Sequence, residues 1–439
     1  MYPMISNQKN QQQILAKLGI TSLNEMQEAA QLAIHSAKEV ILLSPTGTGK
    51  TLAFLLPVIA ELDLSIEEVQ LLIVVPSREL AIQIENVARN MGTGYKIHAA
   101  YGGQSFNTDR QAIKHRPAIL IGTPGRLADH LRRETFSTDY IKTLVLDEFD
   151  KSLEVGFEGE MTEIMSFLPA LEKKVLTSAT QGVDIPRFVG LNSPVEVDYL
   201  HQGGSKLEIK AIISPEKDKL DTLVKALCHL GDQPGIIFCN FKDTISRISD
   251  YLNDHGIAHG TFYGGMEQRE RELSLLKFRN GTHQLLLATD LAARGIDVPE
   301  IKFIIHYHLP IHSEEFTHRN GRTARMQSEG TAYVLHWRNE RLPDFMPVMD
   351  EEYLHDREIP EGSQWTTLEL SGGRKDKISK GDIAGFFFKE GNAQREQLGT
   401  IEVKNTQSFV AVHKSAAQSF IEKLDNKRLK KAKLRIRLA

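Results

Sequence analysis

The chain has 439 residues, 41 % of them hydrophobic and 25 % charged. This composition is typical of a globular protein with two or three domains. No apolar run approaches the roughly 20 residues needed to cross a bilayer, and the polar N-terminus lacks the core of a secretory signal, so no membrane association is expected. Cys228 and Cys239 lack CxxC spacing, which argues against disulfides or structural zinc and favours a cytoplasmic location.

The charge is unevenly distributed along the chain. Residues 364–439 carry 16 Lys and Arg against 8 Asp and Glu, whereas the remainder carries 37 against 49. A basic C-terminal segment on an acidic body indicates that the segment attracts a polyanion.

Residues 1–200 are predicted to form a first α/β domain. Short apolar runs predict buried parallel strands, and amphipathic segments at 51–61 and 78–90 predict helices between them. The runs lie at 40–43, 71–75, 118–121, 143–146 and 175–177. A Gly-Gly pair at 203–204 then indicates a flexible connection.

The same alternation restarts in residues 207–341, which are predicted to form a second α/β domain. Its strands are expected at 235–239, 284–288, 302–306 and 331–335. Residues 342–362 contain prolines and acids and are predicted to be a second linker. Residues 364–439 predict a small ferredoxin-like α+β module of order βαββαβ, the architecture of RNA-recognition modules. Its strands are expected at 366–370, 399–403, 408–412 and 432–438, and its helices at 379–388 and 416–424.

A glycine-rich loop follows the first predicted strand and leads into a helix. In SPTGTGKT, residues 44–51, the glycines let the backbone wrap a phosphate chain, Lys50 neutralises the β- and γ-phosphates, and Thr51 places its hydroxyl on Mg²⁺. The usual pattern has glycine where this chain has Ser44. The loop predicts binding of a nucleoside triphosphate through Thr46, Gly47, Thr48, Gly49, Lys50 and Thr51.

Carboxylates follow the strand predicted at 143–146, in the sequence Asp147-Glu148-Phe149-Asp150. Asp147 is expected to hold a metal ion through water, and Glu148 to accept a proton from the attacking water. On its own, an acidic strand end is more often a helix cap. Together with the phosphate loop it indicates an NTPase.

These motifs resemble those of the DEAD-box ATP-dependent RNA helicases over nearly all of residues 1–340. The resemblance implies two tandem RecA-like domains that use ATP, Mg²⁺ and RNA. It assigns adenine recognition to Gln27 and to Tyr2, although Leu23-Asn24 stands where the family has Pro-Thr. It assigns contacts with the RNA backbone to Pro76, Arg78, Gly102, Gly103, Thr123 and Arg126.

The resemblance also assigns roles to motifs of the second domain. Arg271 and Thr289 would contact RNA, Gly295 and Asp297 the nucleotide, and Arg322 and Arg325 would be arginine fingers. Guanidinium groups meet the charge that develops on the γ-phosphate. Coupling of hydrolysis to strand separation is assigned to Asp150, Ser178, Thr180 and His318.

Phe149 departs from the family, which has alanine there. A bulky ring must find space behind the strand end. Because the neighbouring carboxylates remain, we expect hydrolysis to be intact and its coupling to be tuned.

Each predicted domain supplies half of the catalytic site, so hydrolysis requires closure driven by ATP and RNA. Closure would gather Lys50, Glu148, Arg322 and Arg325 around one γ-phosphate. The family resemblance implies that closure also bends one RNA strand. Phosphate contacts carry little sequence information, so specificity must come from elsewhere.

The stretch GGRKDKI at 372–378, followed by GDI at 381–383, resembles the RNA-binding domain of DbpA-type helicases. This implies large-subunit ribosomal RNA and pre-ribosomal particles as partners of a monomeric protein. The strand that would stack bases has Phe409 as its one aromatic residue, so basic loops with Arg374, Lys375 and Lys377 are expected to dominate binding.

Two alternatives stay open. The chain could be a general helicase that remodels messenger RNA, with the module as a non-specific tether, or an ATP-gated RNA clamp that does not unwind. A DNA helicase is disfavoured by the RNA-type motifs.

Overall fold

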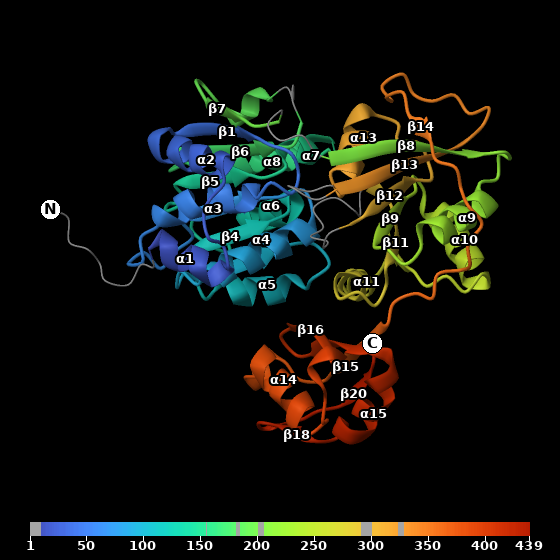
Figure 1. The fold of residues 1–439 in the computed structure, drawn as a ribbon. Coiled ribbons are helices and arrows are strands. Elements are labelled where there is room, and N and C mark those ends of the chain that lie inside the picture. Colours follow the sequence, from blue (N-terminus) through green and yellow to red (C-terminus); the bar gives the residue numbers. More distant parts are fainter. Residues whose placement is uncertain (1–9, 155, 181–184, 201–205, 291–300, 324–328) are drawn as a thin grey trace. The chain divides into compact units, whose positions relative to one another are not determined.

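A computed structural model describes residues 10–154, 156–180, 185–200, 206–290, 301–323 and 329–439 (Figure 1). The chain divides near residue 205 into two compact units, which are described separately. Among the described residues, no helix has the length and apolarity required to span a membrane.

The first unit is built on a parallel sheet of order β3-β4-β2-β5-β6-β1-β7. Alternate residues of its central strands enter two separate cores: Val40 and Leu42 pack on one face, Ile41 and Leu43 on the other. Both faces are therefore buried, as in other parallel sheets. The strands are β1 (Glu39–Leu43), β2 (Leu71–Val74), β3 (Ile97–Ala100), β4 (Ile119–Gly122), β5 (Thr143–Leu146), β6 (Lys173–Ser178) and β7 (Val195–Asp198).

Helices of the first unit cover both faces of this sheet (Figure 1). They are α1 (Gln11–Leu18), α2 (Glu25–Ser36), α3 (Lys50–Ala60), α4 (Arg78–Met91), α5 (Phe106–Ile113), α6 (Pro124–Arg132), α7 (Phe149–Glu154), α8 (Glu158–Ser166) and the short 3-10 helix η1 (Arg187–Val189). The five strands predicted for this domain are confirmed. β3 and β7 were not predicted, because His98 interrupts the first and acidic residues alternate through the second.

The second unit begins with another parallel sheet, of order β10-β11-β9-β12-β13-β8-β14. The four predicted strands lie in it, whereas β8, β10 and β14 were not predicted. Its strands are β8 (Lys206–Ser214), β9 (Gly235–Phe238), β10 (Gly260–Phe262), β11 (Leu285–Ala288), β12 (Phe303–His306), β13 (Glu329–Trp337) and β14 (Asp350–Glu351). Its helices are α9 (Leu220–Leu230), α10 (Lys242–Asp254), α11 (Gln268–Arg279) and α13 (Ser313–Asn320).

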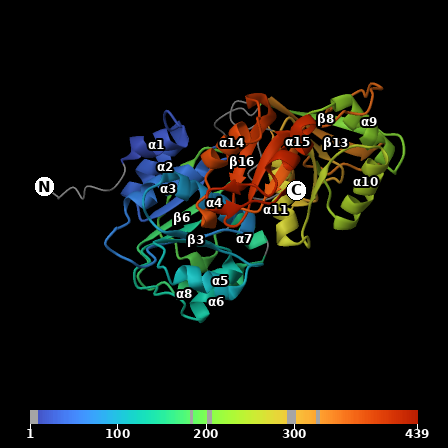
Figure 2. The same ribbon diagram turned by 90° about the horizontal axis from the view of Figure 1, so that it is seen from below.

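The C-terminal module is an antiparallel sheet of order β16-β17-β15-β20, with α14 and α15 packed on one face (Figure 2). This is the predicted ferredoxin-like arrangement. Its elements are β15 (Trp365–Leu370), η2 (Arg374–Asp376), α14 (Lys380–Lys389), η3 (Arg395–Gln397), β16 (Leu398–Val403), β17 (Ser408–His413), α15 (Lys414–Leu424), β18 (Arg428–Leu429), β19 (Ala432–Lys433) and β20 (Ile436–Leu438).

The prediction of one strand over 432–438 is wrong. β19 pairs with β18 in a small hairpin, whereas β20 pairs with β15 in the main sheet. Between them Leu434 is fully buried, and its N–H donates to the carbonyl of Lys427 at 2.9 Å. The backbone therefore changes its partner strand halfway along the segment, and Leu438 at its end is exposed.

The segment 350–362, which we call the strap, runs along the second α/β domain to the module. β14 pairs with β8, and the N–H of His355 donates to His229 Nδ1 at 3.2 Å. At the other end, the N–H of Gly362 donates to Asp232 Oδ1 at 2.8 Å. The predicted linker is thus fixed by hydrogen bonds at several points.

Side chains of α11 and the turn after it contact the open face of the module's sheet. Asn280 Nδ2 donates to Thr367 Oγ1 at 2.8 Å, and Thr282 Oγ1 lies 2.7 Å from the same oxygen. Arg269 pairs with Glu369 at 3.3 Å. These contacts between residues 269–282 and the sheet are polar.

Candidate nucleotide and RNA site

The glycine-rich loop joins the end of β1 to the start of α3. The ammonium group of Lys50 is buried in this loop, where it donates to the carbonyls of Ser44 and Pro45. Gly47 and Gly49 have positive φ values of 83° and 90°, so the loop requires residues without a Cβ. Ser44 Oγ lies 2.7 Å from Thr48 Oγ1, so the residue that replaces the usual glycine helps to hold the loop. Phosphate oxygens can replace the carbonyl partners of Lys50.

Two side chains at the start of α2, one of them from its N-cap residue, hold the far end of this loop. Gln27 Nε2 donates to the carbonyl of Gly49 at 3.3 Å, and Asn24 Nδ2 donates to the carbonyl of Thr48 at 3.1 Å. Asn24 and Gln27 also form a capping box that begins α2. Sequence analysis noted that Asn24 departs from the family pattern. In the structure it is a support of the phosphate loop.

The paired carboxylates lie at the end of β5, in the same sheet as β1. Asp147 is buried and accepts a hydrogen bond from the Thr177 hydroxyl. Burial, reinforced by the negative charge of Glu148, raises the pKa of Asp147 to about 6, against the lowering effect of Thr177. Glu148 has a left-handed backbone with φ of 48°, a costly conformation for a residue with a side chain. Thr177 was not predicted as a site residue.

The residues at this edge fit a Mg²⁺ ion. The Asp147 carboxylate and the Thr51 hydroxyl are oxygen donors, which Mg²⁺ prefers. A divalent cation would also offset the like charges that raise the Asp147 pKa.

Phe149 occupies the position that sequence analysis marked as the departure. It begins α7, is 2 % exposed, and packs in the core with Leu146 and Met161. The next residue, Asp150, accepts a hydrogen bond from Thr180 Oγ1 at 2.9 Å, and the N–H of Thr180 donates to Ser178 Oγ at 3.0 Å. The ring is therefore accommodated without separating the predicted coupling residues of this unit.

Predicted RNA contacts of the first unit gather beside α4. Arg78 lies directly over Gly102 and Gly103, because a Cβ added to Gly103 would lie 2.6 Å from Arg78 Nη1. Pro76 lies between β2 and α4, and Thr123 immediately precedes α6. The side chain of Arg126 is only 12 % exposed, and its guanidinium pairs with Asp109.

The second unit has its own polar centre, at Arg319. Its guanidinium is 1 % exposed, pairs with Asp290, and donates to Asn240 Oδ1 at 2.8 Å. Thr289 follows β11, and the Arg271 guanidinium lies 4.9 Å from the centre of the Phe262 ring. His318 and Arg322 are buried at and beyond the end of α13. Sequence analysis had given Arg319 no role of its own.

Four predicted residues lie outside the described part of the chain. They are Tyr2, Gly295, Asp297 and Arg325.

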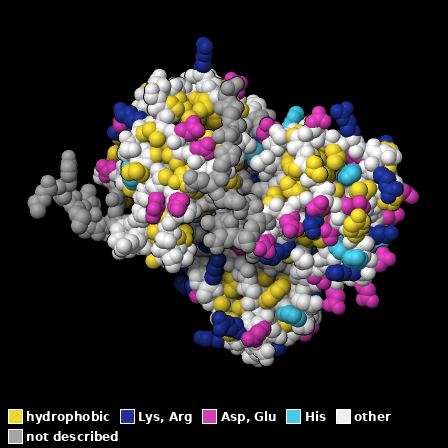
Figure 3. Space-filling view, turned by 45° about the horizontal axis from the view of Figure 1, so that its top comes forward, with side chains coloured by type: hydrophobic (Ala, Val, Ile, Leu, Met, Phe, Trp, Pro, Cys, Tyr) yellow, Lys and Arg dark blue, Asp and Glu magenta, His cyan; other side chains and the backbone are white. Residues whose placement is uncertain are grey.

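The module presents a basic edge, which we define as the turn residues Arg374, Lys375 and Lys377 with the hairpin residues Arg428, Lys431 and Lys433. All six side chains are exposed. Lys430 joins turn and hairpin, because its Nζ donates to the carbonyl of Lys377 at 2.5 Å. The turn is closely packed: a Cβ at Gly373 would lie 2.5 Å from the carbonyl oxygen of Lys404. Lys and Arg side chains are visible on the module at the bottom of Figure 3.

Comparison with known proteins identifies the class. Residues 24–187 match the DEAD/DEAH box helicase model, 218–327 the helicase conserved C-terminal domain, and 367–438 the DbpA RNA binding domain. The chain is 32 % identical over 438 residues to the ATP-dependent RNA helicase DbpA of Escherichia coli (strain K12), covering 97 % of this chain and 96 % of that protein. It is 30 % identical to DbpA of Bacillus subtilis (strain 168), with the same coverage of each.

Solved structures give the same result for the helicase domains. S. cerevisiae Dbp5 bound to RNA and ADP BeF3 is similar with a TM-score of 0.67 and 26 % identity, over 73 % of this chain and 85 % of that one. Mss116p bound to ssRNA and AMP-PNP has a TM-score of 0.68 and 25 % identity, over 75 % and 73 %. The chain belongs to the DEAD-box ATP-dependent RNA helicases and is of the DbpA type. It is an RNA-dependent ATPase.

Proposed function

We propose that this helicase remodels structured large-subunit ribosomal RNA in pre-ribosomal particles, and that its C-terminal module selects that RNA. The observation that carries the proposal is the basic edge, which lies in a module that matches the DbpA RNA binding domain along residues 367–438. Six exposed cationic side chains on one turn and one hairpin suit the closely spaced phosphates of folded RNA.

Contacts on the open face of the module's sheet support the basic edge as the RNA-binding surface. In many modules of this fold, bases stack on aromatic side chains of that face. Here Thr367 and Glu369 on that face contact residues 269–282. The basic edge takes no part in those contacts, so it is the surface that we assign to RNA.

The ATP site supports a mechanism built from this chain's own residues. Lys50 would bind the β- and γ-phosphates once they replace its carbonyl partners, and Glu148 would accept the proton of the attacking water. Arg322 would meet the charge that develops on the γ-phosphate. Thr51 and Asp147 would hold Mg²⁺, which when bound supplies charge neutralisation at the phosphates.

The test compares two triple variants with the same loss of charge. R374Q/K375Q/K377Q removes the turn cations, whereas K389Q/K414Q/K423Q removes exposed lysines from α14 and α15. ATP turnover is measured with large-subunit rRNA fragments and with scrambled RNA of equal length. We expect the first variant alone to need more rRNA for half-maximal turnover, with a salt slope lower by about three.

Other outcomes identify the alternatives. Equal stimulation of the wild-type chain by rRNA and scrambled RNA would overturn the proposal in favour of a non-specific tether. ATP-dependent RNA binding without release of a short duplex would favour a clamp. Equal defects in both triple variants would show that the turn is not the selective surface.

A further inference from the structure

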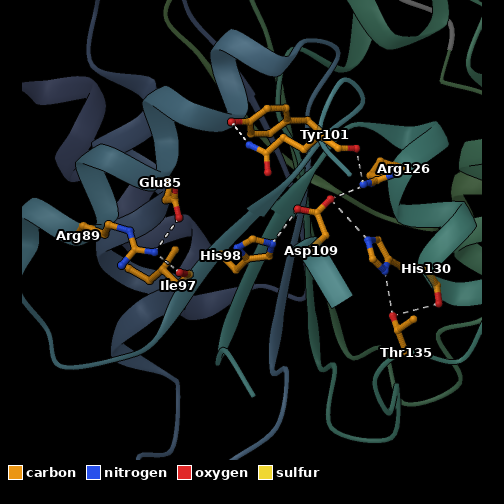
Figure 4. Close-up of polar contacts among 10 residues, drawn as sticks. Glu85, Arg89, Ile97, His98, Tyr101, Asp109, Arg126, His130 and Thr135 are labelled. Atoms are coloured by element: carbon orange, nitrogen blue, oxygen red, sulfur yellow. Dashed lines mark hydrogen bonds and ion pairs between the residues drawn. The ribbon is translucent and has the colours of Figure 1, made fainter. Parts of the chain in front are cut away.

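A buried ionic cluster lies between β3, α5 and α6 (Figure 4). At its centre the Asp109 carboxylate is fully buried and faces three nitrogen-bearing side chains. Arg126 Nε lies 2.8 Å from Oδ2, His98 Nε2 3.3 Å from Oδ1, and His130 Nε2 3.7 Å from Oδ2. Burial alone would raise the pKa of Asp109, but the neighbouring His130 and His98 and the hydrogen-bonded Arg126 guanidinium hold it well below its usual value. Asp109 is therefore an anion inside the domain.

Arg126 links this anion to the loop after β3. Its Nη2 donates to the carbonyl of Gln104 at 3.0 Å, and its guanidinium carbon lies 5.2 Å from the centre of the Phe106 ring. Nε and Nη2 are thus both directed into the protein. The planar guanidinium joins two acceptors at fixed separation, which a lysine ammonium does not reproduce.

The loop that Arg126 holds is the one predicted to bind the RNA backbone. Gln104 directly follows Gly102 and Gly103, and Gly103 has a φ of 92°. The Arg78 guanidinium covers both glycines, and a Cβ added to Gly103 would displace it. A continuous path therefore runs from Asp109 through Arg126 and Gln104 to the Gly102–Gly103 loop and Arg78.

We propose that Asp109 is a positioning residue for RNA binding: it holds the Arg126 guanidinium, which fixes the Gly102–Gly103 loop in the conformation that accepts an RNA phosphate. The inference rests on the predicted role of that loop, and not on ribosomal RNA as the target. A buried ion pair is costly to desolvate and a packed apolar pair is often more stable, so stability alone does not account for this one.

The Arg126→Lys variant distinguishes a positioning role of Arg126 from a direct contact between Arg126 and RNA. If Arg126 bound a phosphate by its charge alone, lysine would retain most of the affinity. If it acts by holding Gln104 and pairing with Asp109, Arg126→Lys weakens RNA binding as much as Arg126→Ala. The measurement is the Kd for oligouridine in the presence of AMP-PNP, with nucleotide affinity and melting temperature as parallel readouts.

Asp109→Asn tests the other end of the path, with Asp129→Asn as the matched control. Asp129 lies on α6 and pairs with Arg133 at the surface, 2.8 Å away. We expect Asp109→Asn to raise the RNA Kd about tenfold with unchanged nucleotide affinity, and the Asp109→Asn/Arg126→Ala double variant to be no worse than Arg126→Ala. Asp129→Asn should leave the RNA Kd unchanged.

All variants are made in the R374Q/K375Q/K377Q background, so that the turn cations of the basic edge do not contribute. The proposed function is tested separately by that triple variant. Full RNA affinity in Arg126→Lys would overturn the proposal. So would additive losses in the double variant, or equal losses of RNA and nucleotide affinity, which indicate general damage to the fold.

Discussion

The side-chain amide of Gln27 fills the space that a Cβ at residue 49 would need. Gln27, which we predict to recognise adenine, is therefore in direct contact with the phosphate loop, and the φ of 90° at Gly49 favours glycine at this position. One hydrogen bond, from Gln27 Nε2 to the carbonyl of Gly49, joins the two segments.

Gly49→Ala should therefore raise the KM for ATP by about tenfold or more, because the added methyl displaces Gln27 and distorts the loop. Gly94→Ala is the control, since Gly94 has nearly the same φ of 93° but nothing within 4 Å of its Cβ position. Steady-state ATPase kinetics measure the difference. Similar KM values in both variants would show that the Gln27 contact is unimportant.

Asp147 predicts a pH dependence of nucleotide binding. Because its pKa is raised to about 6, the carboxylate takes up a proton as the pH falls through that value. Binding of Mg²⁺ with ATP requires the ionised form, so affinity should fall below about pH 6 by up to about tenfold per pH unit. The measurement is titration of a fluorescent ATP analogue with Mg²⁺ between about pH 5 and 8.

The Thr177→Val variant tests whether this pH dependence of nucleotide binding arises from Asp147. The Thr177 hydroxyl lowers the pKa of Asp147, so its removal should move the midpoint to higher pH. A midpoint that stays in place would contradict the assignment of the transition to Asp147.

Phe149→Ala should destabilise the first unit by about 3–5 kcal/mol, because it removes a buried ring from a packed core. The exposed Phe388 of α14 is the matched control, at 42 % exposure. Urea unfolding gives the two free energies. ATP turnover per folded molecule should be retained, since Asp150 and Thr180 keep their hydrogen bond; an abolished turnover in folded protein would contradict this expectation.

Asp290→Asn should cost about 3 kcal/mol of stability in the second unit, because Arg319 is then left buried without its charge partner. The Arg341–Asp344 pair is the comparison, since its side chains are 89 % and 91 % exposed. Asp344→Asn should change the free energy of unfolding by about 0.5 kcal/mol or less. Equal effects of the two variants would contradict the structural role of Arg319.

Local patterns predicted the strands that are buried on both faces and the residues directly after them. Lys50, Asp147 and Glu148 belong to this class, since a phosphate loop and a carboxylate pair are recognisable from sequence spacing. Edge strands such as β7 lack the continuous apolar run and were missed.

Residues that act across long sequence separations could not be predicted in this way. Thr177 reaches Asp147 from 30 positions away, and Arg126 reaches Asp109 from 17. The role of Asn24 could not be predicted either, because the contact of its amide with the phosphate loop depends on the packing of α2 beside α3. The break within 432–438 has the same origin, because the sequence alternates throughout the segment and only tertiary pairing separates its two halves.

The strap restricts the movement of the module relative to the second α/β domain. A flexible linker would let the module move through a large volume, whereas the strap is held by hydrogen bonds at His355 and Gly362. Under the proposed function, RNA bound by the module would be held near the second α/β domain at a high local concentration, without any additional affinity for that domain. Selection and delivery of the RNA would then occur together, and lengthening the strap by inserted glycines would separate them.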